Sequence, residues 1–170
     1  MTNTIIGLES GLLQKTMKRR ILALDLGKKR IGLALSDPLG ITAQGLPTLQ
    51  RTNIRADLEA LGKLIEEREV GEILMGHPLH MSGKEGRQVE YTREFAGRLA
   101  ERTGLDVKFW DERWTTVEAE RVLRESGASI EKRARAVDRL SAVILLSSYL
   151  DSRELDAPTG NEDEAATEHH

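Results

Sequence analysis

The chain has 170 residues, of which 39% are apolar and 31% charged, a balance that fits one α/β domain with a single buried core. It contains no cysteine, which excludes disulfides, thiolate zinc sites and a cysteine nucleophile. Its longest apolar runs, such as residues 142–146, are too short to span a membrane, and the first residues lack the pattern of a secretory signal. We therefore expect a cytoplasmic protein without a membrane partner.

The net charge of −3 is unevenly distributed along the chain. Residues 151–170 carry seven acids against Arg153, a local charge of −6, so the remainder carries +3. Two basic clusters stand out in that remainder: Lys28, Lys29 and Arg30, and then Lys132, Arg133, Arg135 and Arg139. Such clusters are often only solvated surface, but these two lie beside acidic residues, which favours a nucleic-acid-binding surface.

The first half of the chain predicts three strands joined by hairpins. Residues 20–37 alternate two apolar runs around a Gly-Lys-Lys turn and predict a hairpin, with Asp25 at the end of its first strand. A third strand is expected within residues 43–50. A helix capped by Thr52 or Asn53 then runs to about residue 68.

The second half alternates strands with helices. Residues 72–76 predict a short buried strand, and residues 85–102 predict a long amphipathic helix. Residues 107–110 predict a fifth strand. A helix over about residues 115–127 and a last helix over residues 135–150 complete the pattern.

The order of these elements predicts an α/β fold built on a five-stranded mixed sheet. The first three strands form an antiparallel meander, whereas the later strands need helical crossovers and are parallel, with helices flanking the sheet. Residues 1–19 match no element and predict an N-terminal extension, in which Met17 is a candidate natural start. Residues 20–151 form the predicted folded domain, and residues 152–170 form an acidic, disordered tail.

Acidic residues lie at the ends of several predicted elements, where side chains can converge: Asp25, Asp111, Glu112 and Asp138. Phosphodiester hydrolysis needs an activated water and a stabilised leaving oxygen, which two hard divalent cations can provide. Such cations prefer carboxylate ligands. An acid that closes the buried run of residues 21–24 costs free energy unless it is paired, and a metal ion would pair it.

Asp25 and the two adjacent acids also have structural interpretations. Asp25 precedes Gly27 and could form a turn. Glu112 could pair with Arg113 at the surface, or lie favourably before a helix N-terminus. Because successive strand residues alternate faces, only one of Asp111 and Glu112 should point into the site, and spacing does not choose between them.

Asp138 could be a solvent-exposed member of a salt-bridged run with Arg135 and Arg139. Against this interpretation, small and apolar residues recur at helical spacing on roughly the same stripe: Ser141, Ala142, Leu145 and Tyr149. This face of the helix is therefore predicted to pack against the protein, and an acid on a packed face needs a partner.

Four segments carry a family resemblance: LDLGKKRIGLALSDPLG at residues 24–40, ILMGHPLHMSGKEG at 73–86, WDERWTTVEAERVL at 110–123 and VDRLSAVILLSSYLD at 137–151. Together they resemble the bacterial YqgF/RuvX family of Holliday junction resolvases or pre-16S rRNA nucleases. They occur in the family's order and cover most of the predicted domain. The resemblance implies a ribonuclease-H-like fold related to the RuvC resolvases.

The resemblance also implies a catalytic site at Asp25, Asp138 and the Glu112 of the DER motif, and so favours Glu112 over Asp111. The same three acids would bind the metal cofactor, Mg2+ or Mn2+, with two ions expected. Arg113 would contact a phosphate or orient the site. The residues expected to contact nucleic acid are Lys28, Lys29, Arg30, Arg113, Thr115, Thr116, Lys132, Arg133, Arg135 and Arg139.

We therefore predict a metal-dependent nuclease, a hydrolase of phosphodiester bonds that matures the 5′ end of precursor 16S rRNA. The alternatives are a Holliday junction resolvase acting on DNA and a non-catalytic RNA-binding factor in ribosome assembly. An actin-like or hexokinase-like ATPase shares the Asp-x-Gly signature, but it needs two such domains and this chain has room for one. The oligomeric state is left open between monomer and homodimer. His77 and His80 depart from the family pattern and are placed outside the site.

Overall fold

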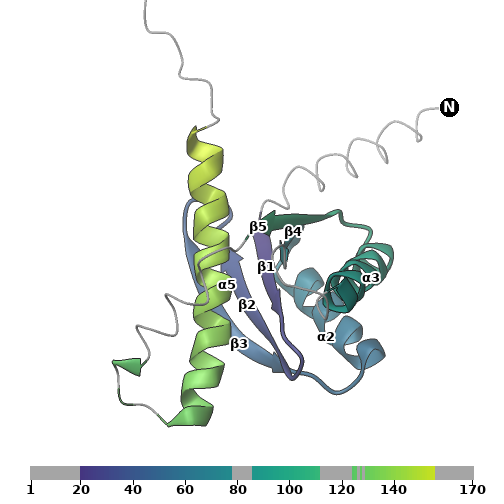
Figure 1. The fold of residues 1–170 in the computed structure, drawn as a ribbon. Helices are drawn as coiled ribbons and strands as arrows, with labels where there is room; N and C mark the ends of the chain where they lie inside the picture. The colour runs from purple at the N-terminus through teal and green to yellow at the C-terminus, as the bar shows by residue number, and fades with distance from the viewer. Residues whose placement is uncertain (1–19, 78–85, 112–123, 126, 128, 156–170) are drawn as a thin grey trace, which may run out of the picture.

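The computed structural model describes residues 20–77, 86–111, 124–125, 127 and 129–155 (Figure 1). Its elements in chain order are β1 (Arg20–Leu26), β2 (Arg30–Ser36), β3 (Ala43–Gln50), α2 (Ile54–Glu67), β4 (Val70–His77), α3 (Gly86–Thr103), β5 (Val107–Asp111) and α5 (Ile130–Leu155). The sheet order is β3-β2-β1-β4-β5. The first three strands pair antiparallel, and β4 pairs parallel with both β1 and β5, which confirms the predicted mixed sheet.

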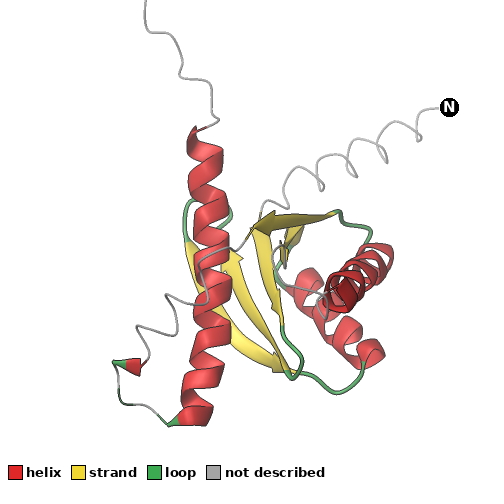
Figure 2. Ribbon diagram, viewed as in Figure 1, coloured by secondary structure: helices red, strands yellow, loops and turns green. Residues whose placement is uncertain are grey.

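The sheet lies between two helical layers, with α2 and α3 on one face and α5 on the other (Figures 1 and 2). Side chains of β1 alternate between these layers. Leu22 and Leu24 belong to the core on the α2–α3 side, whereas Ile21 and Ala23 pack against α5. Asp25 follows the second pattern, so its side chain faces α5.

Helix α5 is longer than the predicted residues 135–150 at both ends, so both predicted boundaries are wrong. At its start, the Ser129 hydroxyl accepts a backbone N–H bond of 3.4 Å and the Ser129 carbonyl accepts another of 2.8 Å. At its end, the helix continues to Leu155, past the predicted domain boundary at residue 151. This last part is held by Arg153, whose Nη1 lies 3.6 Å from Glu72 Oε2. Among the described helices, none is both long and apolar enough to cross a membrane. The helix predicted over about residues 115–127 falls almost entirely outside the described residues.

A polar cluster on the α5 side of the sheet joins that helix to β4 and β5. Tyr149 Oη donates a 2.6 Å hydrogen bond to Glu72 Oε1, and Lys108 Nζ lies 3.0 Å from the same oxygen. The Trp110 ring meets the Tyr149 ring edge-on, with 5.2 Å between centroids. Burial acts to raise the pKa of Glu72, but hydrogen bonds from Tyr149 and Lys108 outweigh it and hold the pKa below its usual value. The cluster thus fixes the C-terminal half of α5 on the sheet.

The other half of α5 approaches the sheet very closely at Gly32 of β2. A Cβ atom at this position would lie 2.1 Å from the backbone carbonyl oxygen of Asp138, a distance that no side chain tolerates. Gly32 is the direct partner of Asp25 across the β1–β2 ladder. The contact therefore brings the part of α5 that carries Asp138 over the end of β1.

We expect Gly32→Ala to lower the free energy of unfolding by ~3 kcal/mol or more, because the added methyl group would force the helix away from β2. Gly97→Ala is the matched control, since a Cβ there would meet nothing within 4 Å on the exposed side of α3. Relief of the glycine penalty should make that variant more stable by ~0.5–1 kcal/mol. Urea unfolding of both variants measures the difference, and equal effects would contradict the close packing.

Candidate functional site

Asp25 is a carboxylate in an unfavourable environment at the end of β1. Burial, and secondarily the negative charge of Asp138, raises its pKa from 3.8 to about 6. Within the described residues, no ion pair joins Asp25 to a basic side chain. At neutral pH the Asp25 carboxylate is therefore ionised with no cationic partner from this part of the chain, which is a situation that a bound metal ion relieves.

Asp138 reaches the same place from α5 and has a partner. Arg30 Nε donates a 2.8 Å hydrogen bond to Asp138 Oδ2, and the two side chains are 21% and 24% exposed. The sequence predicted Arg30 only as a nucleic-acid contact. The structure places it between the β1–β2 hairpin and α5, where it neutralises one of the two acids.

The solvent-exposed interpretation of Asp138 is wrong. Arg135 Nη2 pairs with Glu131 at 3.1 Å, and Arg139 Nη2 donates a 3.1 Å bond to the Gly45 carbonyl, so neither arginine pairs with Asp138. The predicted packed face is confirmed, because the residues of its stripe are buried: Ser141, Ala142, Leu145 and Tyr149.

The β1–β2 turn (residues 27–29) lies directly after Asp25. Gly27 N–H donates a 3.0 Å bond to the Arg30 carbonyl, and a Cβ at Gly27 would lie only 2.6 Å from that oxygen. These backbone atoms close the turn, and among the described residues the Asp25 carboxylate accepts no hydrogen bond from it. The turn leaves Lys28 and Lys29 exposed at its tip.

The second predicted basic cluster lies on the first turns of α5, at the same end of the molecule as the β1–β2 turn (Figure 1). The side chains of Lys132, Arg135 and Arg139 are exposed, and that of Arg133 is half-buried. Asp138 belongs to the same stretch of helix. The two basic clusters therefore flank the acidic pair.

The remaining predicted site residues, Glu112, Arg113, Thr115 and Thr116, lie outside the described residues, as does His80. For Asp111, the neighbouring residues of β5 are informative. Phe109 packs with the core on the α2–α3 side, whereas Trp110 packs on the α5 side. Alternation therefore assigns Asp111 to the face opposite Asp25. His77 pairs with Asp111 in the sheet and meets the Phe109 ring, with 5.3 Å between centroids, so it also lies away from the acidic pair.

The donor set at the acidic pair fits a hard divalent cation. Both ligand candidates are carboxylates, and no basic side chain among the described residues pairs with Asp25. The Ser141 hydroxyl, one helical turn after Asp138, is fully buried and has no hydrogen-bond partner within the described part of the chain. Among those same residues no group of three metal-ligating side chains occurs, so any further ligand would come from outside them.

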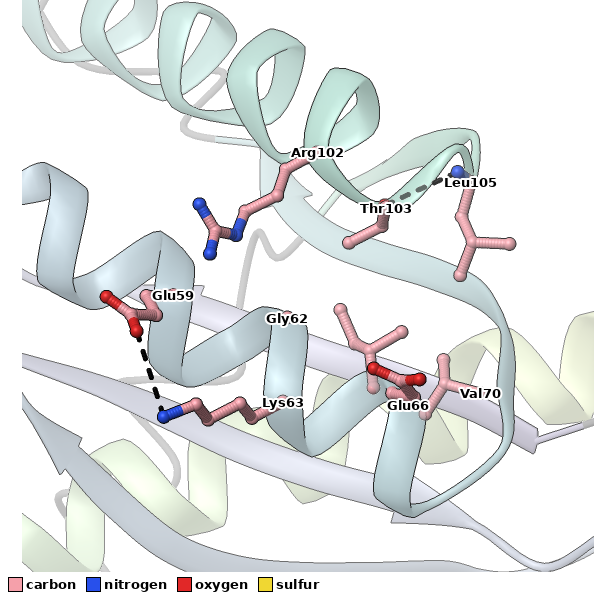
Figure 3. A pocket seen from close by; sticks show the side chains of 9 residues that line it. Glu59, Gly62, Lys63, Glu66, Val70, Arg102, Thr103 and Leu105 are labelled. Carbon is pink, nitrogen blue, oxygen red and sulfur yellow. Dashed lines mark hydrogen bonds and ion pairs between the residues drawn. The ribbon is translucent and has the colours of Figure 1, made fainter.

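A cavity of about 570 Å³ lies between the C-terminal ends of α2 and α3 (Figure 3). Its rim includes the exposed pair Glu59 and Lys63, whose charged atoms are 3.7 Å apart, and the guanidinium of Arg102. The cavity adjoins Val70, where β4 begins. Since β4 runs parallel to β1, the start of β4 lies beside the start of β1, whereas Asp25 lies near the end of β1. The cavity is therefore at the opposite end of the sheet from Asp25 and is separate from the acidic site.

Two residues that shape the site were not predicted from the sequence. Gly32 permits the approach of α5, and a glycine inside a strand pattern is the signal that would have indicated it. Arg51 donates a 2.8 Å bond to the carbonyl of Gly27 from a point 24 positions further along the chain, and no local pattern indicates such a contact.

We expect Asp25→Asn to raise the melting temperature at about pH 7.5, measured without metal ions. The folded-state pKa of about 6 lies above the ordinary 3.8, so ionised Asp25 destabilises the fold once the pH has risen through about 6. Removing the charge should stabilise the neutral-pH protein by roughly 2–3 kcal/mol. As the pH falls below about 4, Asp25 becomes protonated in both states and the gain should disappear.

Asp106→Asn provides the control for this pH dependence, because Asp106 is exposed in the loop between α3 and β5. Its melting temperature should follow that of the wild type at both pH values. A stabilisation by Asp25→Asn of equal size at acidic and neutral pH would show that the charge of Asp25 is not its cause.

Comparison with known sequences places the chain among bacterial relatives. A family model described as RuvX, Holliday junction resolvase, matches residues 19–152. A protein of Koribacter versatilis, named as a candidate pre-16S rRNA nuclease, is 58% identical over 137 residues, covering 81% of this chain and 90% of the relative. A protein of Moorella thermoacetica with the same name is 49% identical over 132 residues, covering 78% and 94%.

Comparison with solved structures shows the fold. T. thermophilus RuvC in complex with Holliday junction substrate matches with a TM-score of 0.53 at 12% identity, over 79% of this chain and 95% of that one. Fowlpox virus resolvase in complex with Holliday junction DNA matches with a TM-score of 0.50 at 10% identity, over 79% and 98%. The fold is thus the RuvC-like, ribonuclease-H-like one that the resemblance implied. With a family model that spans the described domain and relatives of such identity, the chain belongs to the RuvX family.

Proposed function

We propose that this protein is a metal-dependent nuclease that hydrolyses phosphodiester bonds at the 5′ end of precursor 16S rRNA. The observation that carries the proposal is the convergence of Asp25 and Asp138 on one face of the sheet, where only Asp138 pairs with a basic residue among those that the structure describes. The names of the relatives support the choice of substrate. Ribosomal RNA processing in a bacterium would take place in the cytoplasm.

Glu112 is the third carboxylate of the proposed site. Alternation along β5 assigns Trp110 to the α5 side and Asp111 to the opposite side. Asp111 therefore faces away from Asp25 and Asp138, which leaves Glu112 as the candidate of this acidic pair of neighbours. This expectation agrees with the DER motif of the family resemblance and favours Glu112 over Asp111.

Asp25, Glu112 and Asp138 would hold Mg2+ or Mn2+, with two ions expected. When bound, the ions would activate a water for attack on phosphorus and neutralise charge on the leaving oxygen. Arg30 holds Asp138 through Oδ2, which orients the carboxylate and leaves Oδ1 for a ligand. An added positive charge would stabilise the ionised form of Asp25, because burial and Asp138 both oppose its ionisation.

The exposed cations on either side of the acidic pair would bind the phosphate backbone. Lys28 and Lys29 project from the β1–β2 turn, and Lys132 and Arg135 project from the start of α5. Contacts of this kind position a nucleic acid without specifying its sequence. Arg30, Arg133 and Arg139 belong to the same clusters, and Arg113, Thr115 and Thr116 remain predicted substrate contacts from the family resemblance.

A direct test compares the wild type with three variants that remove one carboxylate charge each: Asp25→Asn, Glu112→Gln and Asp138→Asn. The substrates are labelled precursor 16S rRNA ends, single-stranded RNA and DNA, and a four-way DNA junction, each with Mg2+, Mn2+ or EDTA. Losing one ligand should reduce cleavage at least ~100-fold, since removing even an outer-shell partner of a metal ligand costs 10–100-fold. Asp106→Asn should cleave like the wild type.

The preferred substrate then decides between precursor rRNA and a Holliday junction, the second candidate, which the family description and the likeness to RuvC favour. Folded wild-type protein that binds RNA but cleaves none of these substrates with either metal would contradict the nuclease. That result would favour the ribosome-assembly factor.

Salt dependence tests the proposed backbone contacts separately from catalysis. In EDTA, the logarithm of RNA affinity should fall linearly with the logarithm of salt concentration, with a slope set by the number of neutralised phosphates. The double variant Lys28→Gln, Lys29→Gln should reduce that slope by ~1.4 for single-stranded RNA, about 0.7 for each lysine lost. Fluorescence anisotropy between about 50 and 300 mM salt measures it.

Lys63→Gln is the control, because Lys63 is an exposed lysine on α2 beside the cavity at the far end of the sheet. Its slope should equal that of the wild type. An unchanged slope in the double variant would remove the β1–β2 turn from the nucleic-acid interface.

A further inference from the structure

Arg51, in the segment between β3 and α2, joins three separate parts of the fold. Its side chain is 11% exposed. Nε donates a 2.9 Å bond to Asp57 Oδ2 on α2, Nη1 donates a 2.8 Å bond to the Gly27 carbonyl, and Nη2 donates to the hydroxyl of Tyr91 on α3. One guanidinium thus links both helices of this layer to the residue that begins the β1–β2 turn.

The backbone of Arg51 holds the other side of the same turn. Its N–H donates a 2.9 Å bond to the Lys29 carbonyl. The turn is therefore attached to Arg51 at Gly27 and at Lys29, on either side of Lys28. Asp25 lies two residues before the first attachment, and Arg30, the partner of Asp138, directly follows the second.

The buried ion pair of Arg51 with Asp57 carries a large desolvation cost. The Asp57 side chain is only 2% exposed, and removing two charges from water costs several kcal/mol that their attraction need not recover. Well-packed apolar residues could give comparable stability. What they could not do is hold a backbone carbonyl and two side chains at once, because that requires the planar set of donors that only arginine has.

Aromatic rings restrict the guanidinium further. The Arg51 Cζ atom lies 5.4 Å from the ring centroid of Tyr91 and 5.6 Å from that of Phe95. Such cation–π contacts stabilise one orientation of the side chain. The Arg51 guanidinium, which holds the β1–β2 turn, is therefore itself held in place by α3. A substitution at Arg51 should change the position or mobility of the turn.

We propose that Arg51 is a positioning residue of the nuclease site, which holds the β1–β2 turn so that Asp25 and Arg30 keep their places opposite Asp138. This role rests on the proposed nuclease function. The hydrogen bonds of the Arg51 side chain go to Asp57, Gly27 and Tyr91, and not to Asp25 or Asp138. The loss of Arg51 should therefore lower turnover much more than substrate affinity.

The test uses Arg51→Met, which keeps an apolar stem but no donors, and Arg51→Lys, which keeps the charge but lacks the planar donor set. Arg98→Met is the matched control, because Arg98 is also an ion-paired arginine, 2.9 Å from Glu94, on the exposed side of α3. Misplacement by about 1 Å can reduce a rate ~100-fold, so we expect kcat of Arg51→Met to fall ~10–100-fold with KM changed less than ~3-fold. Arg51→Lys should recover part of the loss, and Arg98→Met should resemble the wild type.

Amide hydrogen exchange gives a readout that does not depend on activity. The Gly27 N–H, bonded to the Arg30 carbonyl, should exchange at least ~10-fold faster in Arg51→Met than in the wild type, because the turn opens locally. Amides of β4 should keep their protection if the fold is intact. Loss of protection in β4 to the same extent would assign Arg51 a general structural role and overturn the proposal.

Kinetics separate the remaining outcomes. A rise in KM with kcat unchanged would make Arg51 a substrate contact, reached through the cavity of about 330 Å³ that it lines with Lys28 and Tyr91, and would overturn the positioning role. Active wild type with an equally active Arg51→Met variant would overturn it as well. Wild-type protein that cleaves none of the substrates would instead contradict the nuclease function on which the role depends.

Discussion

The contact between the backbone of α5 and Gly32 is the constraint on which the site depends. The space that a single methyl group would occupy is filled by the Asp138 carbonyl, 2.1 Å from the position of a Cβ. Because Gly32 is the ladder partner of Asp25, this close packing lets Asp138 of α5 approach Asp25 of β1. The Glu72 and Tyr149 bond at the other end of α5 then fixes the direction of the helix.

Bringing two carboxylates together has an electrostatic cost that the fold only partly offsets. Arg30 neutralises Asp138, while Asp25 remains ionised at neutral pH despite a pKa raised to about 6. Structural packing would favour an apolar residue at this position, as at Ile21 and Ala23 on the same face of β1. The retained charge is therefore better explained by a ligand than by stability.

Local sequence patterns predicted most of the fold because strands and amphipathic helices leave periodic signals. The third strand was predicted within residues 43–50 and fills that range, and Asn53 was one of the two predicted caps of α2. The pattern failed at the ends of α5, where Ser129 caps the start and a bond to Glu72 in β4 supports the end. Distant contacts of this kind leave no periodic signal.

The same distinction holds at the site. The acids and the two lysines of the β1–β2 turn could be selected from the sequence, since charge at the end of a buried strand is locally conspicuous. Their partners could not be selected. Arg30 was predicted to contact nucleic acid, but it binds an acid 108 positions away, and Arg51 reaches Gly27 across 24 positions. The acidic residues could be identified from the sequence because burying an unpaired charge is unfavourable. The residues that hold them in place could be identified only from the structure.

The balance of charge at the acidic pair follows from this arrangement. Arg30 offsets one of the two carboxylates, so Asp25, Asp138 and Arg30 together carry a net charge of −1 when Asp25 is ionised. A second arginine paired with Asp25 would stabilise the fold, but its guanidinium would occupy the place of the proposed metal ion. Without Arg30, two uncompensated acids would repel each other at close range. With Glu112 added as proposed, the charge becomes −2, which the first of the two expected divalent ions would neutralise. Arg30 thus offsets one of the two repelling carboxylates and leaves the other with the negative charge that the proposed cation would bind.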